Sequence, residues 1–213
     1  AGNYSTIYTV LEGHTDRVAG DTIPVSFILE DTAGNASDTF TTAISQASDS
    51  IDANSPTITV VTIPDTAMNV GDVVTVSITA SEAGLTLNAG TINGEAVTGF
   101  TDNSDGTYSA TYTVIEGHTD RAAGDAIPVD FVMEDAAGNV SDAFTTAISQ
   151  ASDAIDANSP TITAVTIADT AMKVGDVVTV NITASEAGLT LTSGTINGVA
   201  VTGFTDNGAG NYS

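Results

Sequence analysis

The sequence predicts an all-β protein built from tandem seven-stranded β-sandwich domains in an elongated array. Three observations support this fold class. Residues 49–56 return almost unchanged as residues 153–160, so the chain repeats with a period of 104 residues. Each repeat consists of short segments rich in Thr, Val and Ile with alternating apolar residues, bounded by Gly, Asn and Asp. No segment shows the period of an amphipathic helix.

The complete repeat contains seven predicted strands, at residues 57–63, 72–80, 85–92, 95–101, 107–115, 127–134 and 143–149. The first begins after Pro56, because the residue before a proline is extended. The third is expected to be irregular at Ala89 and Gly90, and Asn93-Gly94 favours a hairpin turn into the fourth. Seven short strands in about a hundred residues, with turns every 8 to 12 residues, are typical of an immunoglobulin-like sandwich.

Alternation along these strands also predicts the core of the sandwich. Every second residue of a strand in such a sheet faces inward, and the intervening Thr and Ser face solvent. The predicted core residues are Val74, Val76, Ile78, Tyr108, Tyr112, Val114, Val129, Phe131, Met133 and Phe144.

The repeated joints divide the chain into three parts. Residues 1–54 form the C-terminal half of one unit, residues 55–158 a complete unit, and residues 159–213 the N-terminal half of the next. Each half leaves sheet edges and an apolar face uncovered. We expect the half-units to be completed by more of the same chain outside these residues.

The charge balance limits the possible partners. The chain has 27 acidic residues against three basic ones, Arg17, Arg121 and Lys173, for a net charge of −24. Nucleic acid and anionic membrane surfaces are therefore poor partners. With no cysteine, disulfides, thiol catalysis and thiolate metal sites are excluded. No apolar run approaches the roughly 18 residues of a membrane span.

Catalysis is not expected, and neither is a small-molecule substrate. No Gly-x-Ser-x-Gly elbow occurs, and the single His of each repeat, His14 or His118, lies in a turn. The simplest interpretation of these two histidines is a side chain that is solvated or paired with a carboxylate. Arg17 and Arg121 are expected to neutralise an acid in the same loop. An alternative function is a carbohydrate- or cell-binding module, although aromatic residues make up only 5% of the chain.

Acidic residues and Asn gather at the joints and in the loops that strand order places beside them. Calcium takes six to eight oxygen ligands, and such loops offer carboxylate, amide and backbone oxygens. We therefore predict Ca²⁺ sites at the joints, with a solvated acidic surface as the alternative. The candidate ligands are Glu12, Asp16, Asp21, Asp31, Asn35, Asp49, Asp52, Asn54, Glu82, Asp102, Glu116, Asp120, Asp125, Asp135, Asn139, Asp153, Asp156, Asn158 and Glu186.

Comparison of the two copies separates these candidates from ordinary surface charge. Most candidates recur one period later, as Asp52 does at Asp156. Asp105, Glu95 and Asp130 do not recur, and they are interpreted as surface charge. They are matched by Ala209, Val199 and Ser26.

Three motifs resemble a known family. They are Asp-(Thr/Ala)-Ala-Gly-Asn at 31–35 and 135–139, Asp-Ala-Asn-Ser-Pro at 52–56 and 156–160, and Gly-His-Thr-Asp-Arg at 13–17 and 117–121. With the 104-residue period, the whole chain resembles the bacterial immunoglobulin-like extender repeats of giant repeats-in-toxin adhesins, including the calcium-dependent extender regions of ice-binding adhesins. The resemblance implies a secreted, extracellular cell-surface protein. In such a protein, Ca²⁺ at the joints stiffens neighbouring repeats so that they project a distal adhesive domain.

Overall fold

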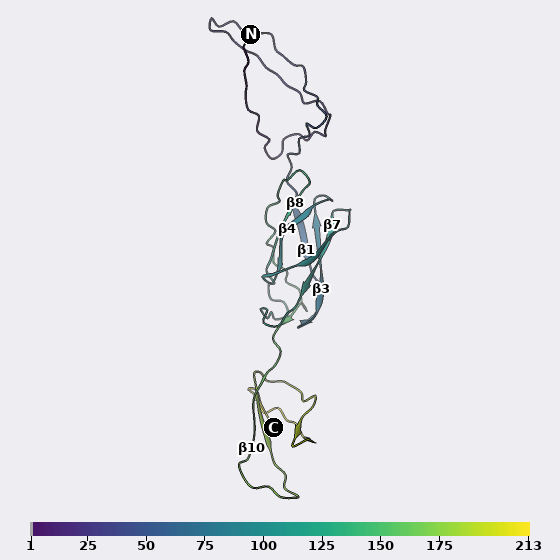
Figure 1. Ribbon diagram of the computed structural model, residues 1–213, viewed down its shortest axis with the longest axis vertical. Helices are drawn as coiled ribbons and strands as arrows, with labels where there is room; N and C mark the ends of the chain where they lie inside the picture. The colour runs from purple at the N-terminus through teal and green to yellow at the C-terminus, as the bar shows by residue number, and fades with distance from the viewer. Residues whose placement is uncertain (1) are drawn as a thin grey trace.

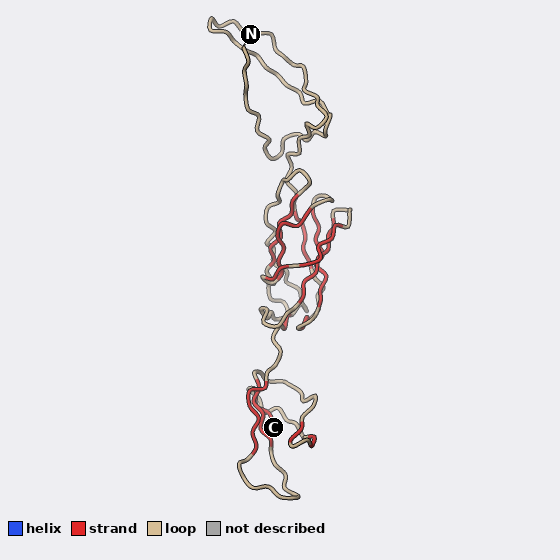
Figure 2. Tube along the Cα trace, in the orientation of Figure 1, coloured by secondary structure: helices blue, strands red, loops and turns tan. Residues whose placement is uncertain are grey.

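The fold is all-β and extended along one axis. The computed structural model describes residues 2–213 and contains no helix in that range. A central body lies between two end segments, with the N-terminus in one and the C-terminus in the other (Figure 1). Most strands belong to the central body, and the N-terminal segment is drawn almost entirely as loop (Figure 2).

The first sheet of the central body has the order β1-β3-β7-β6 and is antiparallel throughout. Its strands are β1 (Ile58–Thr62), β3 (Val73–Ala80), β6 (Thr98–Asp102) and β7 (Thr107–Thr113). Buried and exposed residues alternate strictly along β3, as the predicted period of two requires. One face of this sheet therefore lies on the core.

The second sheet has the order β5-β4-β8. Its strands are β4 (Thr86–Ile92), β5 (Glu95–Ala96) and β8 (Val129–Glu134). β4 pairs with β8 with a register shift between Leu87 and Ala89, close to the predicted irregularity. The turn between β4 and β5 has φ of 56° at Asn93 and 86° at Gly94, as an Asn-Gly hairpin requires.

Three details of the strand prediction are wrong. The predicted strand at residues 143–149 is not continuous, because it meets its neighbour only through isolated bridges such as Phe131↔Phe144 and Ile127↔Ile148. The predicted strand at 95–101 is divided between β5 in one sheet and β6 in the other. Sequence reasoning also missed a short parallel pair, β2 (Met68–Asn69) with β9 (Ile155–Asp156).

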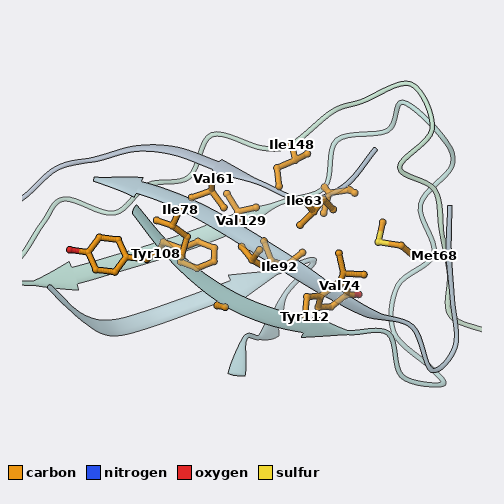
Figure 3. Packing of buried hydrophobic residues seen from close by; sticks show 14 of the residues in the cluster. Val61, Ile63, Met68, Val74, Ile78, Ile92, Tyr108, Tyr112, Val129 and Ile148 are labelled. Atoms are coloured by element: carbon orange, nitrogen blue, oxygen red, sulfur yellow. The ribbon is translucent and has the colours of Figure 1, made fainter. Parts of the chain in front are cut away.

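The two sheets enclose one apolar core, as expected for a sandwich-like arrangement (Figure 3). Nine of the ten predicted core residues are buried, whereas Phe144 is only partly buried against the cluster. The core also takes in residues from the connections. These include Ile63, Met68, Ile148, Ile155 and Ala157.

The two end segments contain less regular structure. The C-terminal segment carries β10 (Ile162–Ile167), β11 (Val180–Ala184), β12 (Thr195–Ile196), β13 (Val199–Ala200) and β14 (Asn211–Tyr212). Residues 2–54 contain isolated bridges in place of strands. Large apolar side chains are exposed in both segments. Between residues 2 and 213, the structure has no helix of the length and apolar character needed to cross a membrane.

Candidate functional site at the acidic joints

The first joint, residues 49–56, is anchored to the loop at residues 12–21 by carboxylates. Asp16 accepts hydrogen bonds from the backbone N–H of Ala53 at 2.9 Å and from Asn54 Nδ2 at 2.7 Å. The Glu12 carboxylate accepts from the Ser55 backbone N–H at 3.1 Å and from its hydroxyl at 2.8 Å. These charge-assisted bonds fix the linker against the preceding unit.

The loop at residues 134–139 approaches the same linker from the central body. Asp135 is buried and accepts from the backbone N–H groups of Ala137 at 2.8 Å and Asn139 at 2.9 Å, and from Asn139 Nδ2 at 2.8 Å. Burial tends to raise the pKa of Asp135, but these hydrogen bonds outweigh it and lower the pKa below the ordinary 3.8. Asn139 Nδ2 also lies 3.4 Å from the backbone oxygen of Asp52. The loop thereby contacts the linker.

Glu82 adds a further carboxylate at this joint. Partial burial raises its pKa above the ordinary 4.5, and the charges of Asp135, Asp52 and Asp16 raise it further. These three residues belong to the central body, the linker and the preceding loop. The joint therefore concentrates negative charge from both sides.

A buried tyrosine holds the Glu82 loop in place. The Tyr108 hydroxyl donates to the Glu82 backbone oxygen at 2.7 Å and accepts from the Leu85 N–H at 3.1 Å. Its ring stacks on Phe100, with centroids 5.3 Å apart. Tyr212 makes the same pair of bonds, to Glu186 at 2.7 Å and from Leu189 at 3.1 Å.

Sequence reasoning missed this positioning role of Tyr108. The sequence feature that could have indicated it is the spacing of 26 residues between the loop glutamate and the tyrosine, which is the same for Glu82 and Tyr108 as for Glu186 and Tyr212.

The second joint, residues 153–160, repeats the anchoring of the first. Asp120 accepts from the Ala157 N–H and from Asn158 Nδ2, both at 2.8 Å. Glu116 accepts from the Ser159 N–H at 2.9 Å. The same joint sequence therefore forms the same anchoring hydrogen bonds at both places in the chain.

Several predicted ligands lie inside the turns of their own unit. Asp153 is fully buried, and its two oxygens accept from the backbone N–H groups of Gly124 at 3.4 Å and Gln150 at 3.1 Å. Asp49 makes the equivalent contacts with Gly20 and Gln46. The structure thus gives Asp49 and Asp153 a loop-closing role.

The remaining candidates divide between local turns and the linker itself. Asp125 accepts from the Ala122 N–H at 3.0 Å, and Asp102 accepts from the N–H groups of Gly84 at 2.9 Å and Ser104 at 2.7 Å. Asp21 donates its backbone N–H to the Val18 oxygen. Asp31 and Asn35 repeat the Asp135–Asn139 contacts within the N-terminal segment. In the two linkers, Asp52 Oδ1 lies 3.4 Å from the Asn54 backbone nitrogen, and Asp156 Oδ1 lies 3.4 Å from that of Asn158.

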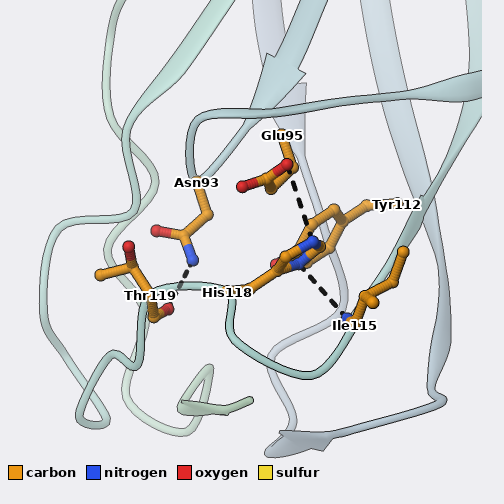
Figure 4. Close-up of polar contacts among 6 residues, drawn as sticks. All are labelled: Asn93, Glu95, Tyr112, Ile115, His118 and Thr119. Atoms are coloured by element: carbon orange, nitrogen blue, oxygen red, sulfur yellow. Dashed lines mark hydrogen bonds and ion pairs between the residues drawn. The ribbon is translucent and has the colours of Figure 1, made fainter. Parts of the chain in front are cut away.

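His118 lies at the other end of the central body, away from the first joint. Its Nε2 is 3.6 Å from the Glu95 carboxylate, and its Nδ1 accepts from the Ile115 N–H at 3.3 Å (Figure 4). Glu95, interpreted as plain surface charge, therefore pairs with His118. Arg121 does not neutralise an acid in its loop, because its Nε donates to Asn93 Oδ1 at 2.8 Å.

The joints offer carboxylate, amide and backbone oxygens, which are the ligands that calcium prefers. Among residues 2–213, no three Asp, Glu or His side chains are close enough together to hold a metal. Burial raises the pKa of Glu82, and the charges of Asp135, Asp52 and Asp16 raise it further, so negative charge from both sides of the joint acts on this carboxyl group. Comparisons with protein-family models, characterised proteins and solved structures found no match for the chain.

Proposed function

We propose that this chain is a structural extender segment of a cell-surface adhesin. Its units are seven-stranded immunoglobulin-like domains in tandem, and Ca²⁺ at the joints stiffens the array. The observation that carries this proposal is the convergence of acidic loops on the first joint, where Asp16 and Glu12 bind the linker from one side and the Asp135–Asn139 loop contacts it from the other. Such a concentration of like charge at a domain boundary favours a divalent cation.

The mechanism begins with repulsion between the facing loops. Without a cation, the charges of Glu82, Asp135, Asp52 and Asp16 repel one another, so we expect the joint to be mobile. The Ca²⁺ ligands at the first joint would come from these four residues and Glu12, which do not form a ready-made metal cluster among residues 2–213. At the second joint the equivalent residues are Glu116, Asp120, Asp156 and Glu186. Calcium would supply the positive charge that turns repulsion between neighbouring units into attraction.

The energetic effect of such binding is large for a small domain. Extracellular calcium modules bind with dissociation constants of about 10⁻⁴ to 10⁻³ M. Calcium at about a hundred times the dissociation constant stabilises the bound state by about 2.7 kcal/mol per independent site. Total domain stabilities are only about 5–15 kcal/mol. We therefore propose an extracellular location, where calcium is abundant, with neighbouring repeats as the partners.

Calorimetric titration with Ca²⁺ and Mg²⁺ tests the proposal on the 213-residue chain. Asp52→Asn keeps the shape of the side chain but removes one charge from the first joint, so we expect calcium affinity there to fall about tenfold. Asp130→Asn is the matched control, because Asp130 is exposed on β8. If Asp52→Asn and Asp130→Asn bind calcium alike, the joint is not the site.

A further inference from the structure

The linker of the first joint is attached to the preceding unit as far as Ser55. A short stretch of chain joins the N-terminal segment to the central body (Figure 1). Within it, Ile51 exchanges two backbone hydrogen bonds with Arg17, at 2.7 and 2.8 Å. Further along, the N–H and the hydroxyl of Ser55 both donate to the Glu12 carboxylate, at 3.1 and 2.8 Å. Residues 51–55 therefore move with the preceding unit.

The central body holds the chain from Thr57 onward. The Thr57 N–H donates to Ser81 Oγ at 3.0 Å, and the Ser81 N–H donates to the Thr57 oxygen at 2.9 Å. β1 begins at the next residue, where Ile58 pairs with Ala80. Pro56 is therefore the one residue between the two attachments.

Proline restricts the backbone at this position. Its ring fixes φ of Pro56 at about −65°. It also confines the preceding residue, Ser55, to extended conformations. Among the torsions between the two attachments, only ψ of Pro56 keeps a wide range, and Pro56 is itself buried. A contact that crosses this position, from Asn139 Nδ2 to the Asp52 oxygen, is 3.4 Å long and restrains the joint weakly.

The second joint has the same arrangement. The Ser159 N–H donates to Glu116 at 2.9 Å, so the linker is again attached to the preceding unit. The Thr161 N–H donates to Ser185 Oγ at 3.0 Å and its oxygen accepts from the Ser185 N–H at 2.8 Å, so the following segment begins there. Pro160 stands between these attachments.

We propose that Pro56 and Pro160 are the pivots of the two joints, and that each proline limits bending between neighbouring units in the absence of a cation. Another residue at the pivot would free its own φ and the ψ of the serine before it. The array thus keeps a preferred direction at each joint when calcium is scarce. The pivot depends on the attachments of the linker and not on calcium, so it goes beyond the proposed cation site.

Pulsed electron paramagnetic resonance on the 213-residue chain in chelator tests the first pivot. The chain has no native cysteine, so spin labels can be placed at Val18→Cys and Val73→Cys. Both valines are exposed. Val18 lies in the loop that holds the linker, and Val73 lies on β3 of the central body. The width of the distance distribution between the labels therefore reports bending at the joint.

Three proline substitutions in this labelled chain separate the pivot from a general loss of proline. We expect the distribution to widen about twofold in Pro56→Gly and less in Pro56→Ala, because glycine has the widest range of φ. Pro64→Ala is the matched control, since the next repeat has Ala168 at the equivalent position. It should leave the width unchanged. Equal widths in Pro56→Gly and Pro64→Ala would overturn the proposal.

A second pair of labels, at Val73→Cys and Asp130→Cys, lies within the central body on exposed positions of β3 and β8. Its distribution should stay narrow in every variant. If it also widens in Pro56→Gly and Pro56→Ala, the proline stabilises the unit and the pivot is wrong. Repeating the measurement in Ca²⁺ tests the extender function separately. If calcium changes no distribution, the calcium-stiffened joint fails, whereas the pivot is judged from the chelator data alone.

Discussion

At the scale of single residues, the buried tyrosine of each unit links the core to the joint. The ring of Tyr108 lies in the core, and its hydroxyl holds the backbone on both sides of the Glu82 loop. Tyrosines are suited to this role because one end is apolar and the other makes hydrogen bonds. Tyr108 is therefore a positioning residue for the proposed cation site.

Tyr108→Phe should affect the joint more than the fold. Loss of the two hydrogen bonds is expected to cost about 1 kcal/mol of unfolding free energy and to lower calcium affinity several-fold. Tyr112→Phe is the matched control, since its hydroxyl faces His118 at 3.5 Å and not the Glu82 loop. Chemical denaturation and calorimetry measure the two effects. Calcium binding that weakens equally in both variants would contradict the positioning role.

The raised pKa of Glu82 predicts how stability depends on pH without calcium. The folded state holds the proton more tightly than the unfolded state, so stability falls as pH rises from about the ordinary pKa of 4.5 through the folded pKa. Glu82→Gln should remove this decrease and leave the joint more stable at neutral pH. Denaturation in chelator between pH 4 and pH 8 measures it. An unchanged pH profile in Glu82→Gln would argue against charge repulsion at the joint.

At the scale of elements, alternation of apolar residues predicted most of the central strands. It succeeded for β3, because burial on one face of a strand directly produces a period of two. It failed at residues 143–149, where an apolar pattern is present but only isolated bridges form. It also missed β2 and β9, since a two-residue pair contains too few residues to show a period.

The candidate site was predictable in composition but not in detailed geometry. The repeat of Asp52 and Asn54 as Asp156 and Asn158 indicated the joints. The sequence did not show that Asp153 is buried in its own turn, because carboxylates at turns and at metal sites have the same local pattern. Tyr108 was assigned only to the core, since its hydroxyl contact depends on the fold.

The same phenylalanine position should contribute differently in the central body and at the N-terminal end. Phe131→Ala removes a fully buried ring between the sheets and is expected to cost about 3–5 kcal/mol of unfolding free energy. Phe27→Ala removes a ring that is 48% exposed, so it should change stability by less than about 1 kcal/mol in dilute solution. Thermal and denaturant unfolding at low concentration compare them. Similar losses for both would mean that Phe27 is not exposed in solution.

At the scale of the whole molecule, the length of the array depends on the stiffness of its joints. Strands of seven or eight residues span about 25 Å, and loops at both ends bring a unit to roughly 40 Å. In a linear array each unit contacts only its neighbours, so reach grows in proportion to the number of units when the joints are stiff. Stiffness is therefore the property on which the proposed extender function depends.

Small-angle X-ray scattering on two tandem copies of residues 55–158 tests calcium-dependent stiffening most directly. Both units are then complete, and the joint between them keeps the sequence of residues 153–160. We predict a maximum dimension near 80 Å, with a narrow distance distribution, in Ca²⁺ only. Chelator or matched Mg²⁺ should give a shorter and broader distribution. If the three curves coincide, the acidic residues serve solubility alone and the calcium-stiffened joint is wrong.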